Sequence, residues 1–289
     1  MSLLIAMPGR DQAIVRDRLL ALDASLDVSL WPELGQADLI EFAVLWNQPN
    51  DLLPQLPNLR VAQSYGAGVE HILNDSNLLQ QTQVVRLGGP RLNTSMVDYL
   101  QKHIQAHEQK LPQDTVIGLL GFGELGQAVA THLMSMNYKV LAYASRQKKH
   151  AKVKTFYGVD LGAMIVQCDF LICLLPLTPA TQNILNIRVL SQCKNDAWLI
   201  NVGRGAQLAE NDLIYALDEG LLRGATLDVT RQEPLPKDHP FFKRNDIELT
   251  HHTASLTDPV EAANVIYENY KSLQQGKTLT FGVDRELGY

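Results

Sequence analysis

Short hydrophobic runs recur along the chain and end at glycine, proline or polar residues. A short run that is apolar at successive positions is typical of a strand buried on both faces. Segments with apolar residues at helical spacing lie between several of these runs. Strands that alternate with helices predict parallel sheets covered on both faces, and therefore an α/β protein. The predicted strands are 3–7, 43–46, 59–64, 84–87, 116–120, 138–144, 169–175, 197–202, 225–229 and 247–250.

The order of these elements predicts two domains. Residues 1–92 hold the first four predicted strands, which is enough for a domain of their own. A helix over 93–109 should connect them to a second domain, residues 93–265. We expect the last helix to be capped by Thr257 and to stop at a glycine. It would return the chain to the first domain, so that residues 266–289 complete that domain.

The predicted strand 116–120 leads directly into Gly121, Gly123 and Gly126, and apolar residues at helical spacing follow. In such a turn the first glycine permits the tight bend, the second lets the backbone approach a pyrophosphate, and the third lets the helix pack on the strand. The pyrophosphate would lie at the helix N-terminus, where free N–H groups and the helix dipole favour an anion. The glycine spacing alone is a weak signal, but its strand–turn–helix setting predicts a dinucleotide-binding site.

The end of the next predicted strand indicates which dinucleotide is bound. NAD sites usually carry Asp or Glu about 20 residues after the glycines, to bind the ribose 2′-hydroxyl. Residues 144–149 contain no carboxylate. Ser145 can donate to a 2′-phosphate, and Arg146 can bind one with its planar fork. Lys149 is also explained by an ordinary exposed basic loop. Such a loop explains less well why the Asp or Glu of an NAD site is absent. We therefore predict NADP as the preferred cofactor, with NAD possible.

Composition narrows the class of protein further. The chain has 289 residues, of which 46% are hydrophobic and 19% charged, and a net charge of −6. An acidic balance argues against nucleic-acid and membrane partners. Three cysteines stand among apolar residues without metal-ligand spacing, so we expect reduced thiols and no metal site; they are Cys168, Cys173 and Cys193. The first residues lack the features of a signal peptide, and we expect a cytoplasmic protein.

Candidate reactive residues follow the predicted strands. Ligands of open parallel sheets bind beyond the carboxyl ends of the strands, and Arg204, Glu233 and His252 all lie there. Singly, each has an ordinary explanation, as a turn residue, a loop carboxylate or a core histidine. Together, beside a dinucleotide, they predict a reaction centre. In the first domain, 66–68 is either a plain tight turn or a nest of N–H groups for a carboxylate.

Motifs along nearly the whole chain occur in the order found in one family. They are YGAGVEHIL at 65–73, GFGELG at 121–126, LLPLTPAT at 174–181, NVGRG at 201–205, LDV and EPLP within 227–236, THHTAS at 250–255, and VDRELGY at 283–289. The chain resembles the D-isomer-specific 2-hydroxyacid dehydrogenases, and within them the reductases of glyoxylate and hydroxypyruvate. The resemblance implies two doubly wound parallel-sheet domains. A Rossmann dinucleotide-binding domain would be inserted in a flavodoxin-like substrate domain.

The resemblance also implies roles for these residues. Arg204 would bind the carboxylate, or the carbonyl next to it, of a 2-oxoacid with its fork. His252 would protonate the carbonyl oxygen as hydride arrives. Glu233 would hold His252 and favour its charged form. The implied substrate contacts are Trp46, Ala67 and Gly68. The implied cofactor contacts are Gly121, Gly123, Glu124, Leu125, Gly126, Ser145, Arg146, Lys148, Leu175, Pro176, Thr181, Val202 and Asp228.

The chain departs from the family pattern at two places. His251 stands where the family has proline before its catalytic histidine, so the two histidines could exchange roles. The segment between Met96 and Thr115 is shorter than the resemblance implies, which weakens the expectation of a homodimer. Two alternatives to a small-substrate reductase stay open. One is a binding protein that senses dinucleotides with little turnover, and the other is a dehydrogenase for a larger 2-oxoacid.

Overall fold

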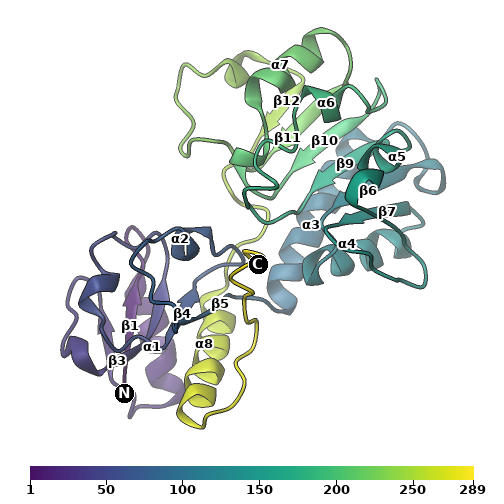
Figure 1. Ribbon diagram of the computed structural model, residues 1–289. Helices are drawn as coiled ribbons and strands as arrows, with labels where there is room; N and C mark the ends of the chain where they lie inside the picture. Colours follow the sequence, from purple (N-terminus) through teal and green to yellow (C-terminus); the bar gives the residue numbers. More distant parts are fainter. The chain divides into compact units, whose positions relative to one another are not determined.

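The computed structural model describes all 289 residues. The chain forms two compact units, residues 1–92 with 257–289, and residues 93–256 (Figure 1). Each unit is an α/β structure built on one all-parallel sheet. The second boundary lies at 256/257, whereas the sequence predicts it at 265/266. The difference arises because the whole of helix α8 (Pro259–Gln274) packs in the core of the first unit.

The sheet of the first unit has the strand order β2-β1-β3-β4-β5. Its strands are β1 (Ser2–Ala6), β2 (Val28–Leu30), β3 (Ile40–Leu45), β4 (Val61–Ser64) and β5 (Gln83–Val85). This is the order of flavodoxin-like doubly wound sheets. The sequence does not predict strand β2, because its three half-buried residues form no apolar run.

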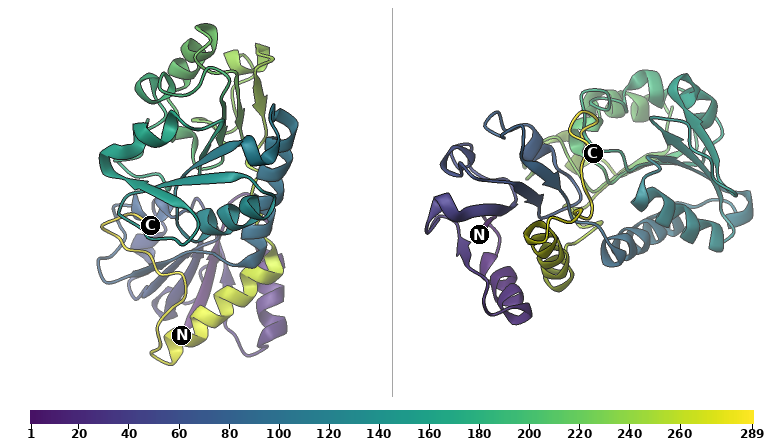
Figure 2. Two further views of the ribbon diagram at one scale, coloured as in Figure 1. Left: turned by 90° about the vertical axis from the view of Figure 1, so that its right-hand side faces the viewer. Right: turned by 60° about the horizontal axis from the view of Figure 1, so that its bottom comes forward.

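Helices cover both faces of this sheet. Alternate residues of β1 point to opposite faces, so Leu3 and Leu4 enter different cores. Helix α1 (Gln12–Leu22) and α8 pack together on one face, as Figure 2 shows, and the short α2 (Glu70–Leu73) contributes to the other. Asp258, not Thr257, caps α8, because its carboxylate accepts from the amides of Val260 and Glu261.

The tail of the chain packs on the first unit, as the sequence predicts. Gly282 forms a bridge with Val85 of β5. The Arg285 guanidinium donates to the carbonyls of Leu79 and Gln80, at 2.9 and 2.8 Å. Residues 279–289 therefore belong to the same compact unit as β1 to β5.

The sheet of the second unit has seven parallel strands in the order β12-β11-β10-β9-β6-β7-β8. The crossover between β6 and β9 makes this a Rossmann-type sheet. The strands are β6 (Val116–Leu120), β7 (Lys139–Ala144), β8 (Lys154–Tyr157), β9 (Phe170–Cys173), β10 (Trp198–Asn201), β11 (Gly224–Leu227) and β12 (Ile247–Leu249).

Two layers of helices cover this sheet. Helices α3 (Pro90–His107) and α4 (Glu124–Ser135) pack on one face, where Leu100 and Leu133 meet Ile117 and Trp198. The other face is covered by α5 (Leu161–Ile165), α6 (Ile187–Leu190) and α7 (Glu210–Asp218). Helix α3 is continuous through the shortened segment, and residues 108–111 alone connect it to the 3-10 turn Pro112–Asp114 before β6.

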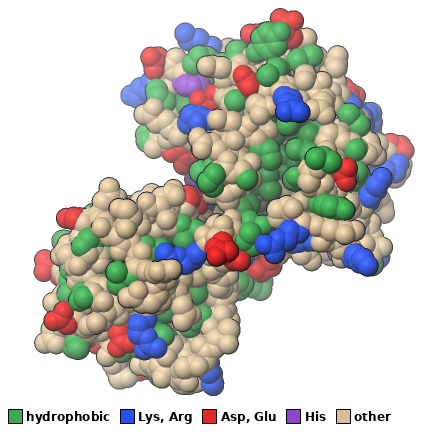
Figure 3. All heavy atoms as spheres, in the orientation of Figure 1, with side chains coloured by type: hydrophobic (Ala, Val, Ile, Leu, Met, Phe, Trp, Pro, Cys, Tyr) green, Lys and Arg blue, Asp and Glu red, His purple; other side chains and the backbone are tan.

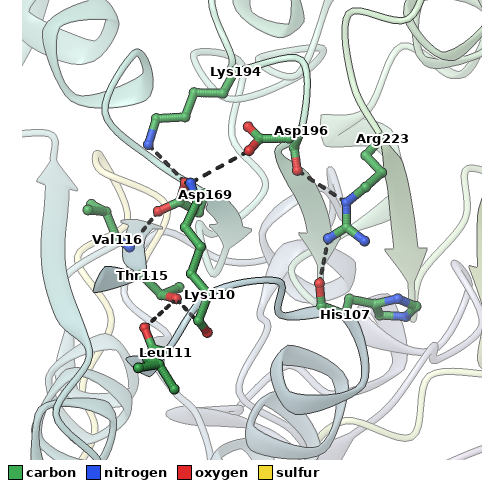
Figure 4. Close-up of polar contacts among 9 residues, drawn as sticks. All are labelled: His107, Lys110, Leu111, Thr115, Val116, Asp169, Lys194, Asp196 and Arg223. Carbon is green, nitrogen blue, oxygen red and sulfur yellow. Dashed lines mark hydrogen bonds and ion pairs between the residues drawn. The ribbon is translucent and has the colours of Figure 1, made fainter. Parts of the chain in front are cut away.

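A cluster around Asp169 anchors this connection to the sheet (Figure 4). The side chain of Asp169 is 9% exposed, and Oδ1 accepts from Lys110 Nζ at 2.6 Å and from Lys194 Nζ at 2.9 Å. Oδ2 accepts from the amide of Val116 at 2.8 Å. Burial acts to raise the pKa of Asp169, but the lysines and the amide hold this pKa below its ordinary value. The ionised carboxylate therefore stabilises the folded state.

Replacement of Asp169 by Asn should lower the free energy of unfolding at pH 7 by about 2 kcal/mol, the scale of a hydrogen bond to a charged group. Because the pKa of Asp169 is lowered on folding, its contribution is present above the ordinary pKa, near 4, and is lost as pH falls through the folded value. The difference between wild type and D169N should therefore shrink in acid. Urea unfolding of both proteins, at pH 7 and in acid, measures this difference in the free energy of unfolding.

Asp196→Asn is the matched control. The carboxylate of Asp196 is 48% exposed and lies 3.6 Å from Lys110 Nζ. Exposed ion pairs contribute about 0 to 1 kcal/mol, so D196N should stay close to wild type. Equal losses for the two variants at pH 7 would contradict the anchoring role of Asp169.

Candidate functional site

The glycine-rich turn connects β6 to α4. Gly121 has φ +112° and lies against the backbone of Leu174, so a side chain there would strain the turn and collide with its neighbour. A Cβ at Gly126 would collide with the carbonyl oxygen of Gly121. Gly123, in contrast, has no heavy atom within 4 Å of the place that a Cβ would take. The turn is therefore closely packed at Gly121 and Gly126 and open at Gly123. The open space at Gly123 would let a pyrophosphate approach the backbone.

The N-terminus of α4 is suited to an anion. Its N-cap residue is Gly123, which offers no side-chain cap. The N–H groups and the dipole at the N-terminus of a helix favour an anion. Ser145 and Arg146 follow β7, the neighbour of β6, and both are exposed. Arg146 makes no hydrogen bond or ion pair within the protein. Lys148 donates to the carbonyl of Phe122 at 2.6 Å and ties this loop to the glycine turn. These groups fit the phosphates of a dinucleotide, a 2′-phosphate included.

The other predicted cofactor contacts lie beside this turn or at the ends of adjacent strands. Thr181 donates to the carbonyl of Pro176 at 2.6 Å and so holds the turn that follows β9. Leu175 and Val202 are buried there. The full set consists of Glu124 and Leu125 in the first turn of α4, Leu175, Pro176 and Thr181 after β9, Val202 after β10, and Asp228 after β11.

Asp228 makes hydrogen bonds inside the protein that the sequence does not predict. It is 2% exposed, and its carboxylate accepts from the amides of Thr253 and Ala254 at 2.8 and 2.9 Å and from Thr250 Oγ1 at 2.5 Å. Its carbonyl accepts from the amide of His252 at 2.7 Å. Asp228 therefore fixes both sides of the loop that carries His252, and its contact with a cofactor stays a prediction.

Glu233 and His252 form a pair at the end of neighbouring strands β11 and β12. Glu233 Oε2 lies 2.9 Å from His252 Nδ1, and Oε1 accepts from the amide of Thr230 at 3.1 Å. The backbone of His252 is left-handed, with φ +56°. The ring is 38% exposed, and its Nε2 has no hydrogen-bond partner within the protein. The adjacent His251 is exposed and makes no hydrogen bond or ion pair with Glu233.

The electrostatics of the pair favour an ionised Glu233. Partial burial acts to raise the pKa of Glu233. The hydrogen bond and charge of His252, the Thr230 amide and the charge of Arg204 together hold this pKa below its ordinary value. A cavity of about 270 Å³ lies beside the pair, with Leu235, Phe242 and Leu249 in its wall. The ionised carboxylate can thus orient the imidazole through Nδ1.

Arg204 reaches the same region from β10, the other neighbour of β11. Gly205 has no room for a side chain, because a Cβ would collide with the backbone of Thr230 in the loop that leads to Glu233. Arg204 Nη1 donates to the carbonyl of Gly203 at 2.8 Å, and the Arg204 charge contributes to the lowered pKa of Glu233. The order β10-β11-β12 therefore brings Arg204, Glu233 and His252 together.

Gln207 is a residue of this site that the sequence does not reveal. It is fully buried, and its Nε2 donates to the carbonyls of Leu175 and Pro176 at 2.8 and 3.0 Å. Its Oε1 accepts from the amide of Arg204 at 2.8 Å. Gln207 thus joins the loop of Arg204 to the turn after β9. No feature of composition or periodicity separates it from a surface glutamine.

The first unit contains the predicted substrate contacts at the carboxyl ends of β3 and β4. Trp46 follows β3, and its ring packs so closely on Gly66 that a Cβ there would collide with it. Ser64 Oγ donates to the carbonyl of Gly68 at 2.6 Å and accepts from the amide of Gly66 at 3.2 Å. The amides of Ala67 and Gly68 donate no hydrogen bond within the protein. They form an open pair of donors that suits a carboxylate.

The structure contains no helix that could span a membrane and no cluster of residues arranged to hold a metal ion. No helix combines the length and the apolar run that crossing a membrane requires. No group of three or more His, Cys, Asp or Glu side chains is arranged to hold a metal ion. The cysteines are free and buried, and burial raises the pKa of each thiol to about 12. On the face drawn in Figure 3, acidic and basic side chains are interspersed.

The Rossmann-type sheet, its open glycine turn and the acid–imidazole pair at the strand ends define a dinucleotide-binding α/β oxidoreductase. The family is shown by sequence. Residues 91–254, more than half of the chain, match the family model described as "D-isomer specific 2-hydroxyacid dehydrogenase, NAD binding domain". The chain belongs to the D-isomer-specific 2-hydroxyacid dehydrogenases, a family of NAD(P)-dependent enzymes, and the second unit is its nucleotide-binding domain.

Individual relatives cover most or all of the chain. It is 34% identical to the glyoxylate/hydroxypyruvate reductase A of Photorhabdus laumondii, over 92% of each chain. A D-isomer-specific 2-hydroxyacid dehydrogenase from Xanthobacter autotrophicus, solved with NADPH and MES, is 27% identical with a TM-score of 0.93, over 100% of this chain and 99% of that one. An NADPH-dependent glyoxylate/hydroxypyruvate reductase from Sinorhizobium meliloti, solved with NADP and sulfate, is 29% identical with a TM-score of 0.92, over all of both chains.

Proposed function

We propose that the protein is an NADPH-dependent reductase that converts a small 2-oxoacid, such as glyoxylate or hydroxypyruvate, to the 2-hydroxyacid. The observation that carries this proposal is the 2.9 Å pair of His252 and Glu233 beside Arg204 at one edge of a dehydrogenase nucleotide-binding sheet. A proton donor, a group that holds it and a cation for a carboxylate are the protein groups that this reduction needs. The names of the relatives support the same substrates.

The residues divide the work as follows. NADPH, when bound, supplies the hydride. His252 Nε2, which has no protein partner, donates a proton to the carbonyl oxygen of the substrate as negative charge develops there. Glu233 holds the ring through Nδ1 and so orients Nε2. Arg204 binds the substrate carboxylate with its planar fork. In the first unit, the amides of Ala67 and Gly68 are donors that suit a carboxylate.

The preference for NADPH depends on the loop after β7. Arg146 is exposed and unpaired, and no carboxylate stands in 144–149. Lys148, in the same loop, donates to the carbonyl of Phe122 in the glycine turn. It adds positive charge where the phosphates of the cofactor would lie. The relatives from X. autotrophicus and S. meliloti were solved with NADPH and with NADP, which supports the same cofactor here.

Replacement of Arg146 by Asp should shift the preference toward NADH. The new carboxylate would repel a 2′-phosphate and could bind a 2′-hydroxyl instead. We expect the ratio of kcat/KM for NADPH to that for NADH to fall about 100-fold, because a charge-assisted hydrogen bond is replaced by a repulsion. Lys149→Asp makes the same change of charge in the same loop and should move the ratio far less. An unchanged ratio in R146D would contradict the 2′-phosphate role.

The proposed reaction is tested by one absorbance assay. Purified protein is mixed with NADPH or NADH and with glyoxylate or hydroxypyruvate, and the nicotinamide band is followed. Rapid oxidation of NADPH and slow oxidation of NADH would support the proposal. Tight binding of NADPH without oxidation by any small 2-oxoacid would favour a dinucleotide-sensing binding protein instead. Turnover of bulky 2-oxoacids alone would favour a dehydrogenase for larger substrates.

Two further properties are proposed with this function. Three reduced thiols suit a reducing compartment, so we infer that the enzyme works in the cytoplasm.

The short connection 108–111 leaves little chain between α3 and β6 for contact with a second copy. We infer that a homodimer, if formed, is weak, and sedimentation at the concentration used for the assay measures it.

A further inference from the structure

Arg10 lies at the edge of the first unit's sheet where the predicted substrate contacts gather. It stands in the loop between β1 and α1, at the carboxyl end of β1. Because the sheet order is β2-β1-β3-β4-β5, the ends of β1, β3 and β4 are adjacent. The Arg10 guanidinium carbon lies 4.4 Å from the centre of the Trp46 ring and 5.8 Å from that of Tyr65. Arg10 therefore belongs to the same edge as Trp46 and the open amides that follow Tyr65.

This guanidinium has no acidic partner. Arg10 makes no side-chain hydrogen bond or ion pair within the protein. The nearest acid in sequence, Asp11, is occupied as the cap of α1. Asp258, whose charge acts on Tyr65, caps α8 and pairs with Arg91 at 2.7 Å. An exposed arginine that aromatic faces hold in place, and that lacks a carboxylate, is preorganised to bind an anion.

The aromatic contacts influence the cation but do not neutralise it. Burial against the rings lowers the pKa of Arg10, while the nearby Tyr65 acts to raise it. An arginine nevertheless stays charged at neutral pH. The guanidinium carbon lies over the Trp46 ring, and the N–H groups at the edge of the guanidinium plane can donate to a bound group.

We propose that Arg10 binds a second anionic group of the substrate, so that the enzyme prefers 2-oxoacids that carry a carboxylate or phosphate in addition to the 2-oxo carboxylate. This inference rests on the proposed function and narrows its substrate class. In the same unit, the amides of Ala67 and Gly68 are the proposed donors for the 2-oxo carboxylate. Glyoxylate, with a single carboxylate, would leave Arg10 without a partner. A substrate with a second anionic group would give Arg10 one.

The test compares substrates of different charge in wild type and in Arg10 variants. Glyoxylate and hydroxypyruvate represent one negative group, oxaloacetate an added carboxylate, and phosphohydroxypyruvate an added phosphate. In wild type, kcat/KM should be higher for at least one substrate with two anionic groups than for either substrate with one. In Arg10→Met, which keeps an apolar stem against Trp46, the ratio of dianionic to monoanionic kcat/KM should fall about 10- to 100-fold, chiefly through KM. Arg10→Lys should retain part of the ratio, because it keeps the charge but loses the fork.

Competitive inhibition provides a second readout that needs no turnover of the dianion. Malonate should compete with glyoxylate more strongly than acetate does, and R10M should remove most of that difference. Arg18→Met, which removes an exposed arginine from α1, should change neither ratio. Equal effects of R10M on mono- and dianionic compounds, with glyoxylate still reduced, would overturn the role of Arg10 alone. Failure of wild type to reduce any of the four 2-oxoacids would overturn the proposed function itself.

Discussion

Replacement of His252 by Gln lowers kcat for 2-oxoacid reduction about 100-fold or more, the usual scale for the loss of a general acid. Glutamine has a similar size and can still accept or donate a hydrogen bond, but it cannot deliver a proton to the carbonyl oxygen. The pairing with Glu233 at 2.9 Å and the free Nε2 of the ring support our proposal that His252 is the donor. Steady-state kinetics with NADPH and glyoxylate measure the loss, and NADPH titration checks that the nucleotide still binds.

His251→Gln is the matched control, because the two histidines are adjacent and could exchange roles. His251 also lines the cavity beside the pair, but it makes no hydrogen bond or ion pair with Glu233. We expect H251Q to retain kcat within about tenfold, since it removes neither proton donor nor orienting carboxylate. A large loss in H251Q with an active H252Q would assign the acid to His251. Full activity of both variants would remove histidine from the mechanism.

Replacement of Arg204 by Lys raises KM for the 2-oxoacid about 10- to 100-fold, the scale of a charge-assisted hydrogen bond. Lysine keeps the charge but loses the planar fork that binds both oxygens of a carboxylate. It also lacks the guanidinium group that donates to the carbonyl of Gly203, so the loop itself is held less firmly. KM for the substrate at saturating NADPH, and KM for NADPH, are measured together.

Arg188→Lys makes the same substitution at an exposed position of α6, away from the strand ends. It should leave both KM values unchanged. If R204K changes KM for NADPH but not for the substrate, Arg204 serves the cofactor and the carboxylate is bound elsewhere. If neither value changes, Arg204 has no part in binding.

The buried strands were predictable because their residues are apolar on both faces. The predicted run 116–120 coincides with β6, and the other predicted runs overlap their strands, with ends that differ by a few residues. Edge and short elements were not predictable. Strand β8 reads Lys-Thr-Phe-Tyr and buries only one side chain fully, and β2, α5 and α6 are too short to show a period. The cap of α8 was predicted one residue too early because Thr257 and Asp258 both have capping side chains.

The candidate reactive residues were predictable for a related reason. In a parallel sheet all carboxyl ends share one edge, so residues that follow three neighbouring strands must lie near each other. That rule places Arg204, Glu233 and His252 together. The rule does not reveal the hydrogen-bond partners of each side chain. The bonds of Asp228 to the His252 loop, and of Gln207 between two loops, join residues far apart in sequence. The stack of Arg10 on Trp46 likewise depends on the strand order.

Transfer of deuterium is the sharpest test of whether this site delivers hydride from NADPH to one face of a 2-oxoacid. Hydroxypyruvate is reduced with NADPH that carries deuterium at the transferable position of the nicotinamide ring. We expect glycerate that carries the deuterium on its hydroxyl-bearing carbon and consists of the D-isomer alone. Glycerate without deuterium, a racemic product, or no glycerate at all would contradict the proposed hydride transfer.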